Sequence, residues 1–511
     1  MSVDTLRETF HINRIKPNSL DDFLTAQTYR PEITATFLKI SRLKCQSLQA
    51  LADNKISQGP TPVYANAGKP ALKSKHTVDM ITESPQGDLV CPNWADEKKK
   101  FLIKRNDLVI TRKGSGTIGR ASIFFGNDPL NSDDSLFKVT LSKVDASYVV
   151  SFLRSYPGQR LLEKGVYGST GQLSLSAEHI RNLPIHTPDP LAQKYIGDKV
   201  RQAEQLRAWA KSIQLKVSKL LPSYINEIQR YKAKSYKAKD IIPERLDSLF
   251  YHPDYIVLES KMKAKGCKRL GLITKQVKDV WNKKKAEAFE YYEIGGLDIT
   301  TGQVFSATTP TAGAPSRAKT KVQQGDVLVS TVRPNRKNIG FIVDNVAHSE
   351  MVATSGFSVL RFSSLTQAAF YHAWLRTDDA TAQLMRWNSG SAYPAIDDDV
   401  PLNIIVPDFE KTFVDNWGQK LLDAHFAYVY AKMLTEAAKT LVEALIEGQL
   451  TEQQLIQAQQ ALEDGGNSLD QAILSKLSAE GYAIEGATPL FSDIDELYSL
   501  LEDAAQAEAE E

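Results

Sequence analysis

The chain has 511 residues, of which 42% are hydrophobic, so its length predicts about three domains with substantial cores. No apolar run approaches the roughly 18 residues of a membrane span, and the charged N-terminus lacks the apolar stretch of a signal peptide. We therefore expect a cytoplasmic protein with no membrane partner. Cys45, Cys91 and Cys267 lie far apart, which predicts buried free thiols and excludes a disulfide framework and a zinc site.

The charge is unevenly distributed along the chain. Residues 451–511 contain 14 acidic residues and one lysine, so they carry −13, and because the whole chain carries +1 the first 450 residues carry +14. A basic body with an acidic tail favours an anionic polymer such as nucleic acid as the partner of the body. A soluble enzyme with a scattered positive surface is the alternative.

The predicted elements form five segments in chain order. Residues 1–190 read as many short strands with few helices, including strands at 107–111 and 120–125 and a helix over 148–162. Heptad spacing predicts a long helix in 191–239, with a kink or restart at Pro222. Residues 240–408 repeat the strand-rich texture, and cleaner heptads predict a helix over 409–447. Such a helix of nearly 40 residues spans about 60 Å, so we expect the two long helices to pack against each other rather than each covering only its own module.

The last segment, residues 448–511, is an acidic extension. A Thr451 cap opens a helix that ends at Gly465 and Gly466, and residues 489–504 form a second amphipathic helix before a frayed end. The sequence leaves its role open between docking a partner protein, mimicking DNA to shield a basic groove, and merely solubilising the chain.

The two strand-rich segments are copies of one another. Matching residues recur at offsets of 219 to 222, which is the length of a whole domain plus a helix. The matches are Asp107 with Asp326, Gly119 with Gly340, Pro188-Asp189 with Pro407-Asp408, Gly197 with Gly418, and Tyr29-Arg30-Pro31 with Tyr251-His252-Pro253. Two similar modules in one chain suggest two similar tasks on two different targets.

Two apparent catalytic motifs fail on their context. Gly114, Gly116 and Gly119 fit the GxGxxG pattern of a dinucleotide site, but the residues that follow predict a strand where that site needs a helix. Asp254, Glu259 and Lys261 resemble a nuclease PD…ExK motif, but the gap is too short for two metal-binding carboxylates on adjacent strands. We find no candidate catalytic residue, no metal site and no cofactor site, so we expect a protein that is not an enzyme.

The candidate DNA contacts lie on loops between strands, where freed backbone N–H groups and cations suit phosphates or base edges. A solvated hairpin tip or a tight closing turn is the alternative for each loop. The candidates in the first module are Arg112, Lys113, Ser115, Thr117, Ser169, Thr170 and Gln172, and those in the second are Arg317, Lys319, Arg333, Asn335, Arg336, Lys337, Ser389, Ser391 and Tyr393.

The ordered set of these segments resembles the DNA-specificity subunit of type I restriction–modification systems. The resemblance is carried by ERLDSLFYHPDY (244–255), EYYEIGGLDITTGQV (290–304), GDVLVSTVRPNRKNIGFIV (325–343), ATSGFSVLRF (353–362) and NSGSAYPAI (388–396), and by NDLVITRKGSGTIGRASI (106–123) and GSTGQLSLSAEHIRNLPIHTPD (168–189). It spans roughly residues 20–447, and the second module matches more closely. In the first module Asn106 stands where the second has Gly325, and the extension 448–511 lies outside the family core.

This resemblance implies an α+β fold with two target-recognition domains joined by two long antiparallel helices. Each domain would read one half of a bipartite sequence in double-stranded DNA, and the helices would fix the spacing. It further implies a non-catalytic subunit on which two DNA methyltransferase subunits, and motor-nuclease restriction subunits, assemble. The alternative is a non-catalytic interaction scaffold of a related phage-defence complex that has lost sequence-specific DNA reading.

Overall fold

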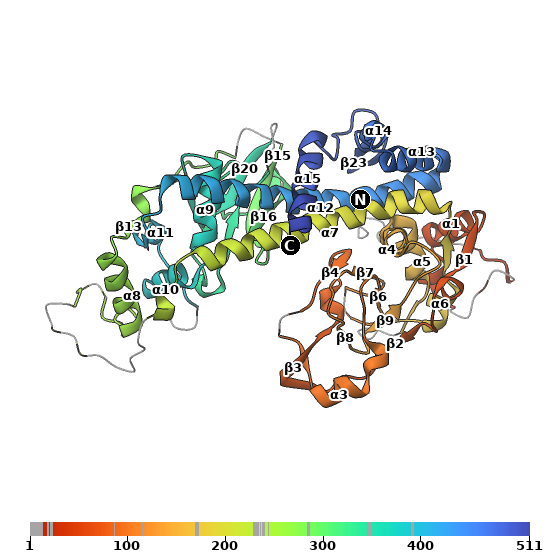
Figure 1. The fold of residues 1–511 in the computed structure, drawn as a ribbon, viewed down its shortest axis with the longest axis horizontal. Coiled ribbons are helices and arrows are strands. Elements are labelled where there is room, and N and C mark those ends of the chain that lie inside the picture. Colours follow the sequence, from red (N-terminus) through yellow and green to blue (C-terminus); the bar gives the residue numbers. More distant parts are fainter. Residues whose placement is uncertain are drawn as a thin grey trace. The chain divides into compact units, whose positions relative to one another are not determined.

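The computed structural model describes residues 14–17, 20, 24–85, 87–114, 116–168, 173–227, 235, 237, 241–243, 245–283, 287–344, 349–389 and 393–510. The chain divides into two compact units (Figure 1). Unit 1 comprises residues 1–205 and 430–503, and unit 2 comprises residues 206–429 and 504–511. We call residues 24–190, within unit 1, copy 1, and residues 245–408, within unit 2, copy 2.

Copy 1 mixes short strands with short helices. Its elements are α1 (Pro31–Ile40), β1 (Cys45–Ser47), α2 (Leu48–Leu51), β2 (Ser57–Gln58), β3 (Tyr64–Leu72), β4 (Ile81–Thr82), β5 (Leu89–Val90), α3 (Pro92–Glu97), β6 (Leu108–Thr111), β7 (Ala121–Phe124), β8 (Asn131–Ser132), β9 (Leu136–Val139), α4 (Ala146–Arg154), α5 (Tyr156–Lys164), β10 (Val166–Tyr167), β11 (Ser174–Leu175), α6 (Ala177–Asn182) and β12 (Pro184–His186). It has more helices than expected, and the helix predicted over 148–162 is two. Ser155 is the N-cap of α5, and Pro157 lacks the N–H that a continuous helix would need.

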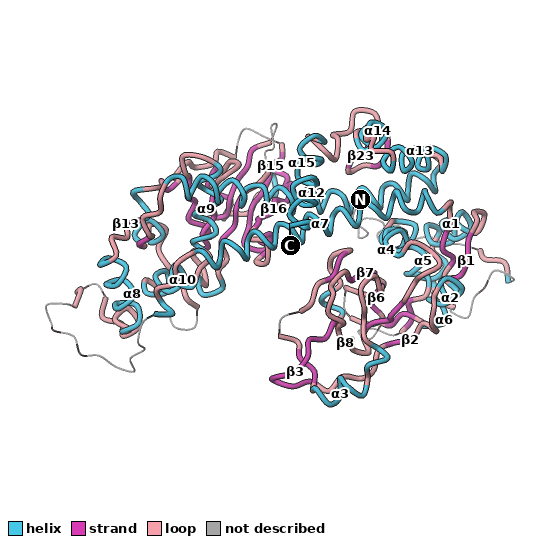
Figure 2. Tube along the Cα trace, in the orientation of Figure 1, coloured by secondary structure: helices cyan, strands magenta, loops and turns pink. Residues whose placement is uncertain are grey.

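Copy 2 has longer strands. Its elements are α8 (Pro253–Ala264), β13 (Lys268–Arg269), β14 (Lys275–Gln276), β15 (Ala288–Asp298), β16 (Gln303–Pro310), β17 (Ala318–Lys321), β18 (Val327–Ser330), β19 (Ile339–Phe341), β20 (Glu350–Thr354), β21 (Phe357–Arg361), α9 (Leu365–Leu375), α10 (Asp378–Arg386), α11 (Val400–Asn403) and β22 (Ile405–Val406). The strands of both copies appear in magenta in Figure 2. The strand pairs are mainly antiparallel and helices accompany them in both copies, which confirms the predicted α+β class.

Sheet topology shows the same duplication. Copy 1 has a five-stranded sheet of order β2-β9-β6-β7-β4, and copy 2 has an eight-stranded sheet of order β14-β21-β18-β19-β16-β15-β20-β17. The first five strands of the second sheet follow the order of the first sheet. Directions agree as well, because β6–β7 and β18–β19 are antiparallel while β4–β7 and β16–β19 are parallel. Copy 1 forms a separate sheet of order β5-β3-β8, whereas in copy 2 the strands β15, β20 and β17 continue the main sheet. The β3–β8 and β15–β20 pairs are both parallel.

Ladder register corrects one of the sequence matches. In copy 1 Ile110 lies opposite Ala121, and in copy 2 Val329 lies opposite Ile339. This register places Lys337, rather than Gly340, at the position of Gly119. Gly119 has φ +78° and Lys337 has φ +54°, so in copy 2 a lysine takes the left-handed conformation that a glycine takes in copy 1.

The residue before each aligned aspartate is left-handed in both copies. Asn106 has φ +68° and Gly325 has φ +83°. Asparagine is one of the few non-glycine residues that adopts this region readily. The difference that the sequence presents at this position therefore leaves the turn unchanged.

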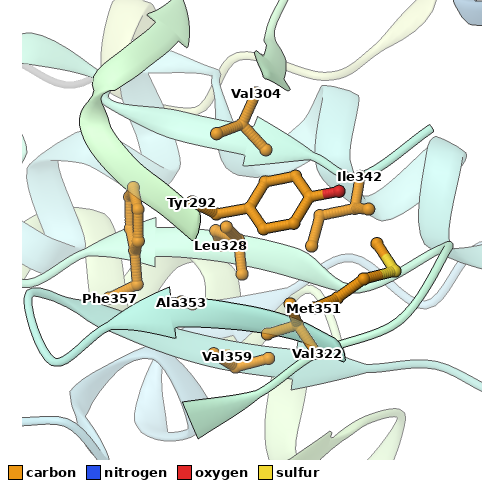
Figure 3. Close-up of a cluster of buried hydrophobic side chains, with 9 residues drawn as sticks. All are labelled: Tyr292, Val304, Val322, Leu328, Ile342, Met351, Ala353, Phe357 and Val359. Carbon is orange, nitrogen blue, oxygen red and sulfur yellow. The ribbon is translucent and has the colours of Figure 1, made fainter. Parts of the chain in front are cut away.

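Equivalent side chains form the core under each sheet. One cluster in copy 1 contains Leu72, Ile103, Val109, Phe124, Leu130 and Leu136. In copy 2 the cluster drawn in Figure 3 contains Tyr292, Val304, Val322, Leu328, Ile342, Met351, Ala353, Phe357 and Val359. Leu328 and Phe357 stand at the ladder positions of Val109 and Leu136. Leu72 and Tyr292 likewise occupy matching places in the parallel β3–β8 and β15–β20 pairs.

A long helix follows each copy: α7 (Pro190–Leu220) and α12 (Lys411–Glu447). Helix α7 ends before Pro222, while α12 matches its prediction closely. In unit 2 the two helices lie side by side, because the Tyr428 hydroxyl donates to Gln214 Oε1 at 3.3 Å. Unit 1 contains the first half of α7 and the last half of α12, and unit 2 contains the last half of α7 and the first half of α12. Two helices that share their halves in this way run antiparallel.

Glycines at equivalent positions let each long helix approach its copy. A Cβ on Gly197 would lie 2.4 Å from Asp145 Oδ1, at the N-cap of α4. A Cβ on Gly418 would lie 2.3 Å from the carbonyl oxygen of Thr366, in the first turn of α9. The recurrence of this glycine in the sequence thus reflects a close contact between two helices.

The acidic extension is folded and packs in unit 1. It contains α13 (Glu452–Glu463), α14 (Ser468–Leu474), β23 (Leu477–Ser478), β24 (Gly481–Tyr482) and α15 (Ile494–Glu510). The Thr451 cap is confirmed, but the expected frayed end is helical through Glu510, and α14 and the hairpin were not predicted. Its residues contact both long helices, as when Tyr430 donates to Glu496 at 2.7 Å.

A buried ion pair joins the extension to α7. Lys199 Nζ lies 2.7 and 2.8 Å from the two carboxylate oxygens of Asp470, and both side chains are 1% exposed. Tyr195 and Tyr498 also donate to this carboxylate, and these contacts hold the pKa of Asp470 below its usual value in spite of burial. This arrangement fixes the extension to the helix by a buried charge rather than by exposed pairs alone.

Candidate nucleic-acid interface

Four loops of copy 2 meet at one end of its sheet. The Thr331 N–H donates to the carbonyl of Gly356 at 2.9 Å, and the Ile396 N–H donates to the carbonyl of Thr331 at 2.9 Å. The Ser355 N–H donates to the carbonyl of Arg317 at 2.7 Å. These bonds bring the loop after β18, the β20–β21 turn, the loop before β17 and the loop before α11 together.

The loop after β18 presents cations to solvent. Arg333 and Lys337 are left-handed and flank the one-turn helix Pro334–Arg336. The Arg333 guanidinium stacks 4.7 Å over the ring of Tyr393, and the main-chain N–H of Arg333 donates to the carbonyl of Pro394 at 2.7 Å. Arg336 is exposed, and Lys337 pairs with Asp378 at 2.7 Å. Two candidate loops separated by more than 50 residues thus form one surface.

Arg336 and Lys337 also border a cavity in unit 2 of about 620 Å³. Helices α7 and α12 line part of it, and Lys211 of α7 adds positive charge. The end of α9 and the start of α10 form another wall, which carries Arg376 and the acidic Asp378. The Arg376 guanidinium donates to the carbonyl of Ile299, so it braces the fold. The charge around this cavity suits an anionic ligand.

Arg245 is a supporting residue that the sequence did not reveal. Its guanidinium donates to the carbonyls of Trp387 at 3.1 Å and Asn388 at 2.9 Å, and it stacks 4.7 Å from the Phe250 ring. It therefore fixes the start of the loop that carries Ser389 and Tyr393. The sequence holds no signal for this contact, because more than 140 residues separate the partners.

The loops of copy 1 meet in the same register. The Arg112 N–H donates to the carbonyl of Ser135 at 2.8 Å, and the Leu175 N–H donates to the carbonyl of Arg112 at 2.8 Å. Lys113 bridges Ser174, as Val332 bridges Ala395 in copy 2. The main chain therefore builds the same surface in both copies, and we call it the platform. In copy 1 it comprises the loop after β6, the β8–β9 turn and the segment at Leu175, and in copy 2 the loop after β18, the β20–β21 turn and the loop before α11.

Side chains on the two platforms differ. In copy 1 Lys113 Nζ lies 2.6 Å from the carboxylate of Asp134, and the Arg112 guanidinium donates to the carbonyl of Asp134 at 2.9 Å. The ladder positions of Asp134 and Ser135 correspond to Ser355 and Gly356. The cations of copy 1 thus face an acidic residue where copy 2 has a serine.

The remaining candidates fall into three groups. Thr117 Oγ1 is buried with no hydrogen-bond partner among the described residues, whereas the Ser389 hydroxyl donates to the carbonyl of Ala395 at 3.2 Å. Arg317, Lys319 and Asn335 are exposed. Five candidates lie outside the described residues: Ser115, Ser169, Thr170, Gln172 and Ser391. The DNA-contact role of every candidate stays a prediction.

A salt bridge or hydroxyl contact braces the aligned aspartate behind each platform. Arg361 holds both carboxylate oxygens of Asp326 at 2.7 Å, while Asp107 accepts from Thr140 at 2.6 Å. Burial raises the pKa of Asp326, and the Arg361 guanidinium opposes that rise. These aspartates are fully enclosed by the fold, so they support the loops rather than contact a ligand.

The structure agrees with the rejection of both apparent catalytic motifs. The residues after Gly119 form strand β7, so no helix N-terminus faces the glycine loop. Asp254, Glu259 and Lys261 all lie on helix α8, where Lys261 pairs with Glu227 rather than with a metal site. Within the described residues no group of three histidine, cysteine or acidic side chains could hold a metal ion.

Two further observations concern the cysteines and the helices. The three cysteines are free, as predicted, but half-buried rather than buried. Among the described helices, none is both long and apolar enough to cross a membrane.

Comparison with known proteins gives likenesses in structure alone. Neither a protein-family model nor a curated protein matches the sequence. The S subunit of a type I restriction–modification system from M. genitalium is 13% identical, covers 81% of this chain and 95% of its own, and has a TM-score of 0.37. The HsdS subunit from Thermoanaerobacter tengcongensis is 12% identical, with coverages of 80% and 97% and a TM-score of 0.26.

A third structure, reported for complex assembly and conformational transition of the type I R-M system, is 11% identical with coverages of 81% and 97% and a TM-score of 0.27. The first two structures are named as S subunits, and the third is named for the type I R-M system as a whole. With TM-scores below 0.5, these likenesses carry no conclusion about the function of this chain.

Proposed function

We propose that this protein is a non-catalytic, sequence-specific DNA-binding subunit that reads a bipartite target and directs methyltransferase subunits to it. The observation that carries the proposal is the duplicated platform, in which one main-chain register presents different polar side chains in copy 1 and copy 2. Cations beside exposed backbone and aromatic groups suit phosphate and base-edge contacts. Two platforms of different chemistry suit two different half-sites.

The long helices fit a role in spacing the half-sites. Helix α7 has 31 residues and α12 has 37, which correspond to roughly 46 and 55 Å. One turn of duplex measures about 34 Å, so helices of this length suit half-sites more than one turn apart. We propose restriction subunits, assembling on the same chain, as further partners.

Selection from randomised duplexes tests the proposal. The full chain, with and without its methyltransferase, is mixed with the pool, and bound DNA is recovered and sequenced. We expect two short motifs at a fixed separation. The absence of any two-part preference under both conditions would reject the proposal.

Charge reversal separates this function from that of an interaction scaffold without DNA reading. Arg333→Glu, Arg336→Glu and Lys337→Glu together should lower DNA affinity at least about 100-fold and flatten its salt dependence, because fewer phosphates are neutralised. Lys275→Glu is the control, since Lys275 is exposed on β14 beside Arg361, at the opposite end of β21 from the platform. A scaffold predicts unchanged DNA affinity in both variants.

A further inference from the structure

The β8–β9 turn of copy 1 contains two acidic residues, Asp133 and Asp134, and the fold accounts for only the first. Asp133 is 7% exposed, and its carboxylate accepts from the Ser135 N–H at 2.9 Å and from the Tyr64 hydroxyl at 3.2 Å. It therefore shapes the turn. Asp134 has no comparable role, because its carboxylate meets Lys113 alone among the described contacts.

Asp134 lies at the surface where the loops of copy 1 meet. Its side chain is 22% exposed and that of Lys113 is 42% exposed, so both reach solvent. The adjacent Ser135 carbonyl accepts the Arg112 N–H, which places this turn against the loop after β6. The ladder-equivalent residue in copy 2 is Ser355, so a carboxylate is not needed to build the turn.

A carboxylate in a DNA interface repels phosphates and needs a donor to offset that cost. The exocyclic N4 amino group of cytosine is such a donor in the major groove, and lysine commonly donates to guanine O6 or N7. The A·T pair is a poorer match for a carboxylate, because its adenine N6 amino group lies between two acceptors, adenine N7 and thymine O4, whereas cytosine N4 has an acceptor, guanine O6, on one side only. The 2.6 Å separation of Asp134 and Lys113 places an acceptor and a donor side by side, and one C·G pair displays the complementary groups.

We propose that Asp134 is a specificity-determining residue of copy 1 and that, with Lys113, it reads a C·G base pair through the major groove. Asp134 accepts a hydrogen bond from cytosine N4, and Lys113 donates to guanine O6 or N7. This inference rests on the proposed DNA-reading function. It identifies which platform carries the acidic reader and which base pair that reader selects.

Sequencing of bound duplexes from a randomised pool, at one fixed salt concentration, tests the inference with full-length Asp134→Ala. We expect the preference for C·G to fall about 10- to 100-fold at one position of one half-site, with the other half-site unchanged. Asp134→Glu should restore part of that preference. Asp96→Ala is the matched control, because it removes an exposed pair with Lys69 in the same copy and should leave every position unchanged.

The outcomes separate the inference from the proposal beneath it. If Asp134→Ala alters the affinity for all sequences equally, or leaves every position unchanged, Asp134 merely braces the loop and the inference is wrong. If the unmodified chain selects no motif, the DNA-reading function itself fails. Should Asp134→Ala not fold, Lys113→Met gives the same test, with loss of preference expected at the same base pair.

Discussion

Copy 1 and copy 2 share a backbone plan and differ in what they place on it. Both have the same five-strand order, the same left-handed turn before the buried aspartate and the same hydrogen bonds between the candidate loops. Copy 1 sets Arg112 and Lys113 against Asp134, whereas copy 2 stacks Arg333 on Tyr393 and exposes Arg336. The comparison teaches that main-chain bonds define the platform, so its side chains are free to differ.

The largest expected contrast between equivalent positions is at Lys199 of α7 and Lys420 of α12. Lys199→Met leaves Asp470 buried without its cation and should lower the free energy of unfolding by about 3–5 kcal/mol. Lys420 is exposed and stacks 4.8 Å from Trp417, so Lys420→Met should cost under about 1 kcal/mol. Chemical denaturation gives both values, and proteolysis within 448–510 reports release of the extension. Equal effects would contradict the contrast between the buried lysine and the exposed one.

Alanine at the two helix glycines should separate the copies by a smaller amount. In Gly418→Ala the new Cβ meets the main chain of Thr366, which cannot move alone. We therefore expect the free energy of unfolding to fall by about 2 kcal/mol. In Gly197→Ala the Cβ meets the Asp145 side chain, which can rotate at the expense of its cap on α4, so we expect about 1 kcal/mol or less. Thermal denaturation of the two variants measures the difference, and a larger loss for Gly197→Ala would contradict this account.

A third contrast concerns pH. His425 is fully enclosed in unit 2, stacks on Phe341, and has its pKa lowered from 6.5 to about 3 by burial and the Arg376 guanidinium. The unfolded chain therefore takes up a proton below about pH 6.5 that folded unit 2 does not, and unit 2 loses about 1.4 kcal/mol per pH unit between those values. His425→Phe should remove the contribution of His425 to this slope.

Proteolysis in denaturant at pH 7, 6 and 5, with cleavage sites assigned to each unit, measures the slope separately in the two units. The variant should protect unit 2 at pH 5 and leave unit 1 unchanged, because His425 belongs to unit 2. A loss on acidification that persists in the variant would assign the slope to other groups, such as His372, whose pKa burial also lowers.

Local pattern was enough to predict the duplication, the strand after the glycine loop, helix α12 and the Thr451 cap. These features depend on apolar runs, heptads and capping residues that lie close together in the chain. The equivalence of Lys337 with Gly119 was missed, because a single lysine in a left-handed conformation has no sequence signature. Contacts such as Arg245 with Asn388 and Lys113 with Asp134 also required the structure, since folding alone brings those residues together.

The site of Asp470 has a practical consequence for handling the protein. At about 1 M salt the Debye length is near 3 Å, so exposed pairs such as Lys39 with Glu447 and Lys194 with Glu463 lose most of their attraction. The pair of Asp470 with Lys199 excludes solvent and ions and is largely spared. A preparation washed in concentrated salt to strip nucleic acid should therefore retain its extension in place, whereas acid, by protonating Asp470, should loosen it.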